Sequence, residues 1–175
     1  VLVARIAIPQ ARYAEPAQVT AFFDELTTRV AAIPGVRETG LSMAVPPHRL
    51  VMRNPYTPEG TVFGPGESAP VAEELLTDPG YFRALGIPLR AGRLFTPQDR
   101  EGAPLVTIVN ETFARRHFPR GAIGRWIQTG DPDPNADRMT IVGVVADVKY
   151  QGLGTDAEPT IYVPFAQNGW GRRMY

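Results

Sequence analysis

The residues best suited to chemistry form one acidic loop. Residues 131–137 place four oxygen side chains at alternate positions, the spacing by which a calcium loop surrounds a hard cation. The pattern fails at two defining positions, because Ala136 and Val142 stand where a calcium loop needs a glycine and a bidentate glutamate. Two prolines also stiffen the loop. The spacing therefore favours a solvated connection between strands over a metal site.

The other candidate chemistry is sparse. His48 and His117 are the only histidines, so a histidine ligand or base would have to be one of them. Ser42 and Ser68 lie in no G-x-S-x-G elbow, and the chain has neither a P-loop nor a G-x-G-x-x-G turn. We therefore expect a surface or capping role for both histidines, no nucleotide or other cofactor, and no catalytic residue.

The amino-acid composition argues against several classes of protein. Among 175 residues, 18 basic and 18 acidic side chains cancel, so the charge expected of a nucleic-acid or anionic-membrane binder is missing. The absence of cysteine excludes disulfides and thiolate zinc sites. No apolar run approaches the roughly 18–20 residues of a membrane helix. Because the chain opens directly in a strand-like run, without an initiator methionine, we expect a piece of a longer protein.

The first third predicts a β-α-β unit. Residues 1–8 are rich in β-branched side chains and predict a strand. Residues 16–33 carry apolar side chains at i, i+3, i+4 and i+7, which predicts an amphipathic helix ended by Pro34 and Gly35. Residues 36–45 predict a strand returning beside the first. Residues 46–70 are rich in proline and glycine, so we expect a long surface excursion that either shapes a partner surface or is filler.

Residues 78–95 contain the highest density of residues that start and stop helices. After a strand at 71–77, Asp78 predicts a helix cap, Pro79 the first helical position and Gly86 the stop. The result is a rigid corner without a nucleophile, base or metal ligand. Thr96 and Asp99 then predict a capping box opening a helix of one or two turns.

The remaining pattern predicts strands with one helix among them. Asn110 is placed to cap a helix at 111–118. The strands are predicted at 105–109, 123–129, 139–148 and 160–163.

The motifs together resemble a known family. The stretches that carry the resemblance are 33–36, 79–89, 92–95 with Asp99, 109–114, 123–127, 141–148 and 161–164. In this order they are similar to the MacB-like periplasmic core domain of FtsX-like permease subunits of ABC transporters, particularly permeases that carry the domain in duplicate. The positions within them that serve as structural motifs are Pro79, Gly80, Tyr81, Phe82, Gly86, Gly92, Arg93, Asn110, Gly124 and Gly143.

The resemblance implies a mixed α/β, α+β domain of two lobes. The larger, porter-like lobe would comprise 1–91 plus 152–175, truncated at its C-terminus, and a smaller, mostly-β, sabre-like lobe would be inserted at 92–151. The corner at 78–95 would lie at their junction. The resemblance also implies a place on the periplasmic face of the bacterial inner membrane, within an integral membrane protein. A cytoplasmic partner ATPase and a second permease copy would complete the transporter.

Two functions remain open on these grounds. The first is an extracytoplasmic permease domain that couples ATP hydrolysis by the partner to export or to mechanical work in the periplasm. The second is a free-standing periplasmic or secreted metal-dependent hydrolase that uses the 131–137 loop with His117.

Overall fold

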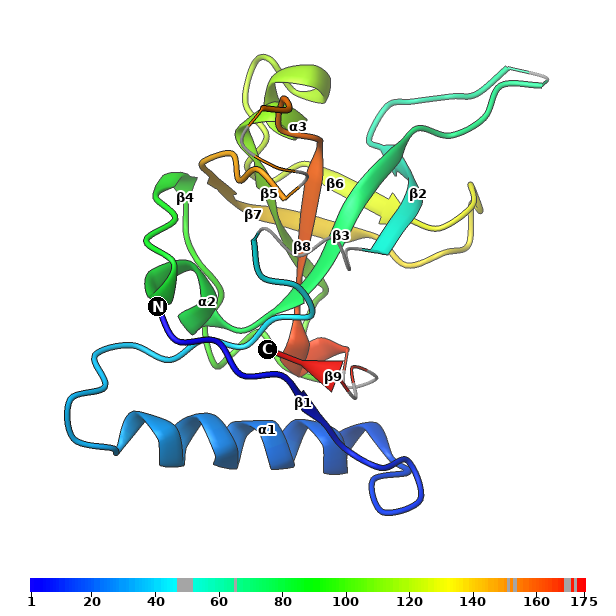
Figure 1. The fold of residues 1–175 in the computed structure, drawn as a ribbon. Coiled ribbons are helices and arrows are strands. Elements are labelled where there is room, and N and C mark those ends of the chain that lie inside the picture. Colours follow the sequence, from blue (N-terminus) through cyan, green and yellow to red (C-terminus); the bar gives the residue numbers. More distant parts are fainter. Residues whose placement is uncertain (47–51, 65, 151, 153, 169–170, 172) are drawn as a thin grey trace.

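A six-stranded barrel forms the centre of the molecule. The computed structural model describes every residue except 47–51, 65, 151, 153, 169–170 and 172 (Figure 1). In chain order the elements are β1 (Ile6–Ala7), α1 (Pro16–Ala31), β2 (Met52–Pro58), β3 (Val71–Thr77), α2 (Pro79–Ala84), β4 (Leu89–Gly92), β5 (Val106–Asn110), α3 (Glu111–His117), β6 (Trp126–Thr129), β7 (Met139–Val145), β8 (Thr160–Pro164), a 3-10 turn (Phe165–Gln167) and β9 (Arg173–Met174).

The barrel closes through β6. The strand order is β4-β7-β5-β8-β3-β2-β6, and β6 also pairs with β7. Because β6 is bonded to both β2 and β7, the six strands from β7 to β6 form a closed ring, while β4 stays outside it on β7. The β3–β8 and β5–β7 pairs are parallel and the other pairs are antiparallel. The mixed α+β class predicted from the sequence is confirmed.

Alternate residues of the strands face two hydrophobic clusters. One cluster draws on all six barrel strands and includes Phe23 of α1 and Phe113 of α3. The second lies on the other face of β3, β5 and β8, where Tyr81 and Phe82 of α2 pack against Tyr162. The helix α2 therefore packs on a different face of these strands from α1 and α3.

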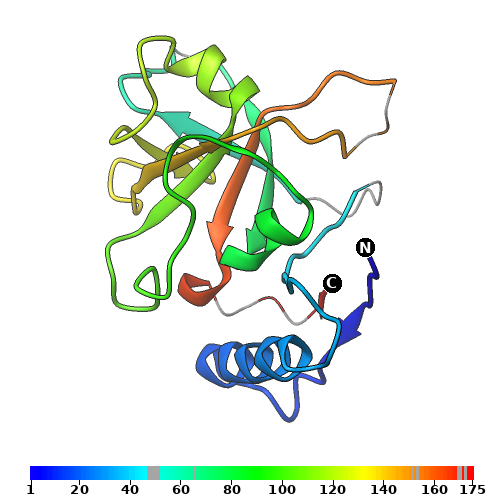
Figure 2. The ribbon, with the colours of Figure 1, turned by 90° about the vertical axis from the view of Figure 1, so that its left-hand side faces the viewer.

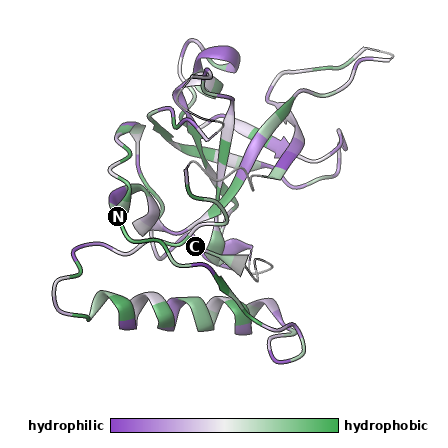
Figure 3. Cartoon of the chain, viewed as in Figure 1, coloured by the Kyte–Doolittle hydropathy of each residue, from purple (hydrophilic) through white to green (hydrophobic). Residues whose placement is uncertain are grey.

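A smaller layer lies beneath the barrel. It consists of α1 and the antiparallel pair β1–β9, in which Ile6 pairs with Met174 (Figure 2). Polar and apolar residues alternate around α1, as the spacing predicted (Figure 3). Its Phe23 packs edge-on against Phe165, with ring centroids 5.5 Å apart, so the helix is docked on the barrel through the turn after β8. We call α1, β1 and β9 the N-terminal layer.

The predicted β-α-β unit is wrong. β1 is shorter than expected and pairs with β9, and residues 36–45 form no strand; their one ladder contact is the bridge between Ser42 and Thr77. The reason is that this segment, the linker, runs between the N-terminal layer and the barrel. Some backbone hydrogen bonds of the linker go to the N-terminal layer and others to the barrel. Neither the β1–β9 ladder nor a ladder with β3 continues along the linker.

The prediction that 46–70 is one long surface excursion is wrong for Met52–Pro58, which forms β2. β2 lies between β3 and β6. Its prolines are tolerated because Pro58 ends the ladder with β6 and Pro55 lies just beyond it, where its carbonyl still accepts from Gly130 N at 2.9 Å. Residues 59–64 and 66–70 do form an excursion, which projects from the barrel in Figure 1.

Two further boundaries differ. The helix predicted after Thr96 is only a turn, because the Asp99 carboxylate binds Thr96 N (2.8 Å) and Arg93 while no helical backbone bonds follow. β6 begins at Trp126, after the positive φ of Gly124. The division into lobes stays a prediction; strands from 1–91, 92–151 and 152–175 pair within one sheet.

Candidate functional site

The corner at the start of α2 joins the linker to the barrel. Asp78 caps α2 as predicted, since its Oδ1 accepts a hydrogen bond from Tyr81 N at 2.8 Å. The same oxygen accepts a second bond from Leu41 N at 2.9 Å. One carboxylate therefore satisfies an orphan donor of the helix and a donor of the linker, Leu41, which lies 37 residues before Asp78 in sequence.

Two glycines let the linker backbone lie directly on α2. A Cβ on Gly80 would stand 1.9 Å from the carbonyl oxygen of Thr39, and one on Gly40 would stand 2.6 Å from the Cα of Tyr81. Both distances are far below van der Waals contact, so only glycine fits at either position. Gly80, which the sequence marked only as part of a motif, is thus half of a backbone-to-backbone contact.

The linker is bonded on both sides. Ser42 exchanges backbone bonds with Tyr175, at 3.1 and 2.7 Å, beside the end of β9. Met43 N donates to Leu76 O at 3.1 Å, and Asp78 N donates to Leu41 O at 3.0 Å. We call residues 39–43 with Asp78 and Gly80 the clasp. Through it, the N-terminal layer is fixed to the end of β3 and to α2.

The electrostatics of the clasp reflect its burial. Desolvation raises the pKa of Asp78, and the backbone hydrogen bonds from Leu41 and Tyr81 act in the opposite direction. The carboxylate is thus held by directed donors within the fold.

Three tyrosine hydroxyls meet behind α2. Tyr81 OH lies 2.5 Å from Tyr150 OH, which lies 3.4 Å from Tyr162 OH. All three side chains are buried, and burial is the largest cause raising the pKa of each phenol. The phenols therefore stay neutral at physiological pH, and the cluster ties α2 to β8 and to the segment after β7.

The corner continues into a second close contact at β4. Gly92 (φ +72°) pairs with Gly143 of β7, and a Cβ on Gly92 would stand 2.1 Å from Val142 O. Arg93 follows and binds the Asp99 carboxylate through both terminal nitrogens, at 2.7 and 2.8 Å. This bidentate pair closes the turn that leads to β5.

Asn110 does more than cap α3. Its Oδ1 accepts from Phe113 N (2.9 Å), as the sequence predicted, and also from Thr160 N (3.0 Å), while its Nδ2 donates to Glu158 O (2.8 Å). Asn110 thus joins α3 to the start of β8. At the same end, Asp147 accepts from Thr112 N and Thr112 Oγ1, both at 2.8 Å. No local pattern around Asp147 predicts this role, because its partner Thr112 is on another element.

Within the described part of the chain, the acidic loop and His117 do not come together as a metal centre. Among the described residues, no group of three or more histidine, aspartate or glutamate side chains could hold a metal ion. In the loop, Asp133 accepts from Asn135 N at 2.8 Å, the turn bond of a solvated connection. His48 falls outside the described residues.

His117 is held against β2. Its Nε2 lies 2.7 Å from the hydroxyl of Tyr56, a buried residue. Burial first, and the charge of Arg116 second, lower the pKa of His117 to about 4. His117 is therefore neutral in the fold at neutral pH.

A pH dependence follows from His117. In the unfolded chain the imidazole titrates near 6.5 and in the fold near 4, so the unfolded state binds the proton first. The stability contributed by neutral His117 is complete above pH 6.5 and falls as the pH drops toward 4. Urea unfolding at pH 7, 5.5 and 4.5 should show a loss that is smaller in His117→Gln. Parallel pH profiles for the two proteins would contradict it.

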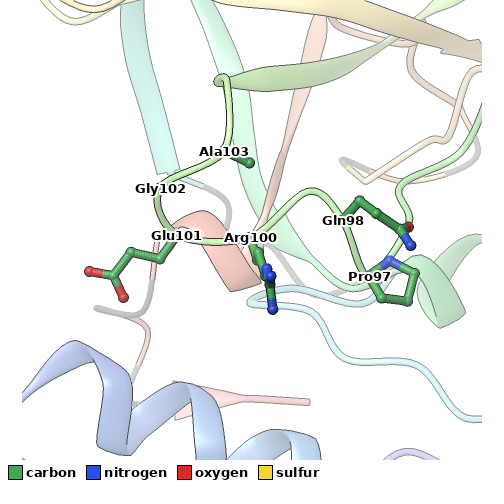
Figure 4. A pocket seen from close by; sticks show the side chains of 6 residues that line it. All are labelled: Pro97, Gln98, Arg100, Glu101, Gly102 and Ala103. Atoms are coloured by element: carbon green, nitrogen blue, oxygen red, sulfur yellow. The ribbon is translucent and has the colours of Figure 1, made fainter.

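A hollow of about 510 Å³ on the surface is lined by Pro97, Gln98, Arg100, Glu101, Gly102 and Ala103 (Figure 4). All six residues belong to the single turn between Arg93 and β5, and most of their side chains point apart from one another. Such a hollow presents no set of convergent polar groups to a substrate. The clasp is therefore the better candidate for a functional element.

The chain matches the model of the MacB-like periplasmic core domain over residues 5–174. None of the curated proteins compared with it matches. Among helices of the described residues, none is long and apolar enough to cross a bilayer.

Solved structures share the fold. The periplasmic region of MacB from Actinobacillus actinomycetemcomitans is similar at 16% identity and a TM-score of 0.51, over 86% of this chain and 62% of that one. A domain of a putative permease protein from Porphyromonas gingivalis is similar at 17% identity and a TM-score of 0.55, over 84% of this chain and 63% of that one. The extracellular domain of the noncanonic ABC-type transporter YknZ from Gram-positive bacteria is similar at 16% identity and a TM-score of 0.52, over 92% of this chain and 71% of that one. The chain thus spans less than two thirds of the first two.

Proposed function

Because this chain belongs to the family of MacB-like periplasmic core domains, we propose that it is the extracytoplasmic domain of an ABC transporter permease and that it transmits movement. In this role it couples ATP hydrolysis by a cytoplasmic partner ATPase to export or to mechanical work in the periplasm. A second permease copy completes the transporter at the outer face of the bacterial inner membrane. We assign the domain no catalytic step.

The observation that carries the mechanical role is the clasp. Transmission requires parts that move as units, and a joint whose groups have alternative partners would yield under load. In the clasp, one carboxylate oxygen holds two backbone donors and two glycines allow backbone contact. The N-terminal layer and the barrel then shift together.

The described residues do not support a metal-dependent hydrolase. It required the 131–137 loop and His117 to share a metal ion, and the imidazole Nε2 of His117 is engaged by Tyr56 OH. No described group of side chains has the composition of a metal site.

The proposal is tested by movement in the assembled transporter. This segment has no cysteine, so Ala21→Cys on α1 and Asp137→Cys on the β6–β7 connection, both at exposed positions, each give one fluorophore site in it. The full-length permease, with any cysteines outside this segment replaced, is reconstituted with its ATPase in liposomes that contain an acceptor lipid. ATP is expected to change energy transfer to the lipid at both sites.

The possible results separate two claims. If neither label responds to ATP, the coupling function is wrong. If only the label on α1 responds, the coupling stands and the rigid clasp is wrong. An ATPase variant that binds but does not hydrolyse ATP, with the same labels, is the matched control and should hold the domain in one position.

A further inference from the structure

Two extended rows of backbone lie on opposite edges of β9. On one edge β1 pairs with β9 and places Ile6 opposite Met174, and the row 1–5 precedes β1. On the other edge, the backbones of Ser42 and Tyr175 exchange hydrogen bonds of 3.1 and 2.7 Å, so the linker is antiparallel to β9 as well. Figure 2 shows the C-terminal end between the N-terminal row and the linker.

The two rows are separated by the width of one strand. Because they border opposite edges of β9, they lie two strand spacings apart where β9 ends, which is about 9–10 Å. Residues 1–5 are all exposed, and so are residues 36–38 of the linker. Nothing in the described part of the chain therefore fills the space between the rows 1–5 and 36–40, which we call the slot.

The backbone of both rows is unpaired along the slot. In an antiparallel ladder every second residue directs its N–H and C=O groups toward the same partner. Ser42 faces β9, and since Tyr175 directs its bonds to Ser42, Met174 directs its own to Ile6. The residues two and four positions before Ser42 and Ile6 therefore face the slot. Within the described residues, these four make no backbone hydrogen bond: Leu2, Ala4, Glu38 and Gly40.

The helix beneath the slot is also incompletely covered. The apolar stripe of α1 starts at the buried Phe23 and continues to Val30 and Ile33, which are 36% and 53% exposed. Leu2, which is 97% exposed, lies on the same face of its row as Ile6, and Ile6 packs in the cluster that contains Phe23. Unpaired backbone and an uncovered apolar stripe thus occur in the same layer.

We propose that, in the full-length permease, the residues after Tyr175 continue β9 as a strand through the slot, antiparallel to both rows. Continuity identifies the occupant, because β9 already pairs with both rows and runs toward the slot. By these registers, the first and third residues after Tyr175 lie opposite Ala4 and Leu2, and the second and fourth lie opposite Gly40 and Glu38.

This strand accounts for the β-α-β pattern of the sequence. The segments predicted as strands, 1–8 and 36–45, become parallel strands with α1 as their crossover, separated by one antiparallel strand. This chain covers less than two thirds of two similar solved domains, so a domain of this fold has length for a further strand. The proposal rests on the permease proposed above and is independent of the coupling to ATP hydrolysis.

Disulfide formation in the full-length permease tests both registers. With other cysteines replaced, Leu2→Cys is combined with a cysteine at the third residue after Tyr175, and Glu38→Cys with one at the fourth. Residues opposite each other on neighbouring strands have Cα atoms within the roughly 4.4–6.8 Å that a disulfide requires. Mild oxidation should close both disulfides within one chain, at least about tenfold faster than in the matched control. The control is Leu2→Cys with a cysteine at the second residue, whose side chain lies on the opposite face.

Four results would overturn the proposal. They are equal rates in and out of register, no disulfide in either pair, disulfides only between two chains, and a disulfide at Leu2→Cys without one at Glu38→Cys. The third result, seen as a dimer on a non-reducing gel, would assign the strand to a second permease copy, and the fourth would leave the linker side of the slot open. Oxidation is measured without ATP, so fluorophores that fail to respond to ATP would remove the coupling and leave an in-register disulfide as support for the strand.

Discussion

Replacing Asp78 with alanine is expected to lower the free energy of unfolding by about 1.5–5 kcal/mol. The variant loses the cap of α2, worth about 0.5–2 kcal/mol, and leaves Leu41 N–H without its acceptor in a partly buried site, at a cost of about 1–3 kcal/mol. Denaturant unfolding of the 175-residue chain measures the difference.

The matched variant is Asp78→Asn. Both backbone donors bind the same oxygen, Oδ1, so the asparagine oxygen can accept both bonds. Asparagine is also as good an N-cap as aspartate. We expect Asp78→Asn to cost less than about 1 kcal/mol, since it loses mainly the charge-assisted part of the interaction. Equal losses in Asn and Ala variants would mean that the charge, and not the geometry of the clasp, stabilises the corner.

Gly92→Ala is expected to be the other severe change, with a loss of about 2–5 kcal/mol. A left-handed φ costs a non-glycine residue about 1–2 kcal/mol, and forced overpacking adds about 1–3 kcal/mol. Both apply here, because Gly92 has φ +72° and its Cβ would stand 2.1 Å from Val142 O. That oxygen cannot retreat freely, since it accepts a hydrogen bond from Arg93 N at 2.9 Å.

Gly86→Ala is the control for Gly92→Ala. Gly86 also has positive φ, +66°, but a Cβ there would meet nothing within 4 Å. Only the conformational cost remains, about 1–2 kcal/mol. Thermal unfolding should therefore rank Gly92→Ala well below Gly86→Ala. Equal melting temperatures would show that β4 moves away from β7 at little cost.

Local signals in the sequence predicted the elements that local chemistry decides. The caps Asp78 and Asn110 and the stop at Gly86 are found where the side-chain and backbone chemistry required them. β3 and β5 to β8 also lie within a few residues of the predicted strands, because their apolar runs are buried.

What the sequence could not predict depends on distant partners. β2 was missed because its prolines are tolerated only at the limits of one ladder, and that ladder is with β6, far along the chain. The linker resembled a strand because its composition is that of a buried extended segment, but its bonds are shared by two layers. Only one part of the clasp could be predicted. The cap that Asp78 forms on α2 is a local contact, whereas the hydrogen bond from Leu41 N to Asp78 joins residues far apart in the sequence.

The pairing of β1 with β9 has a consequence for the order of folding. Ile6 and Met174 come from opposite ends of the chain, and a contact of such sequence separation forms late. The strands from β2 to β8 can close the barrel first. Residues 1–8 and α1 can complete the N-terminal layer only when β9 is present to pair with β1. During synthesis, Ile6 and Ala7 therefore have no strand partner until β9 has emerged, which makes the N-terminal layer the stage at which a nascent chain is most open to misassociation.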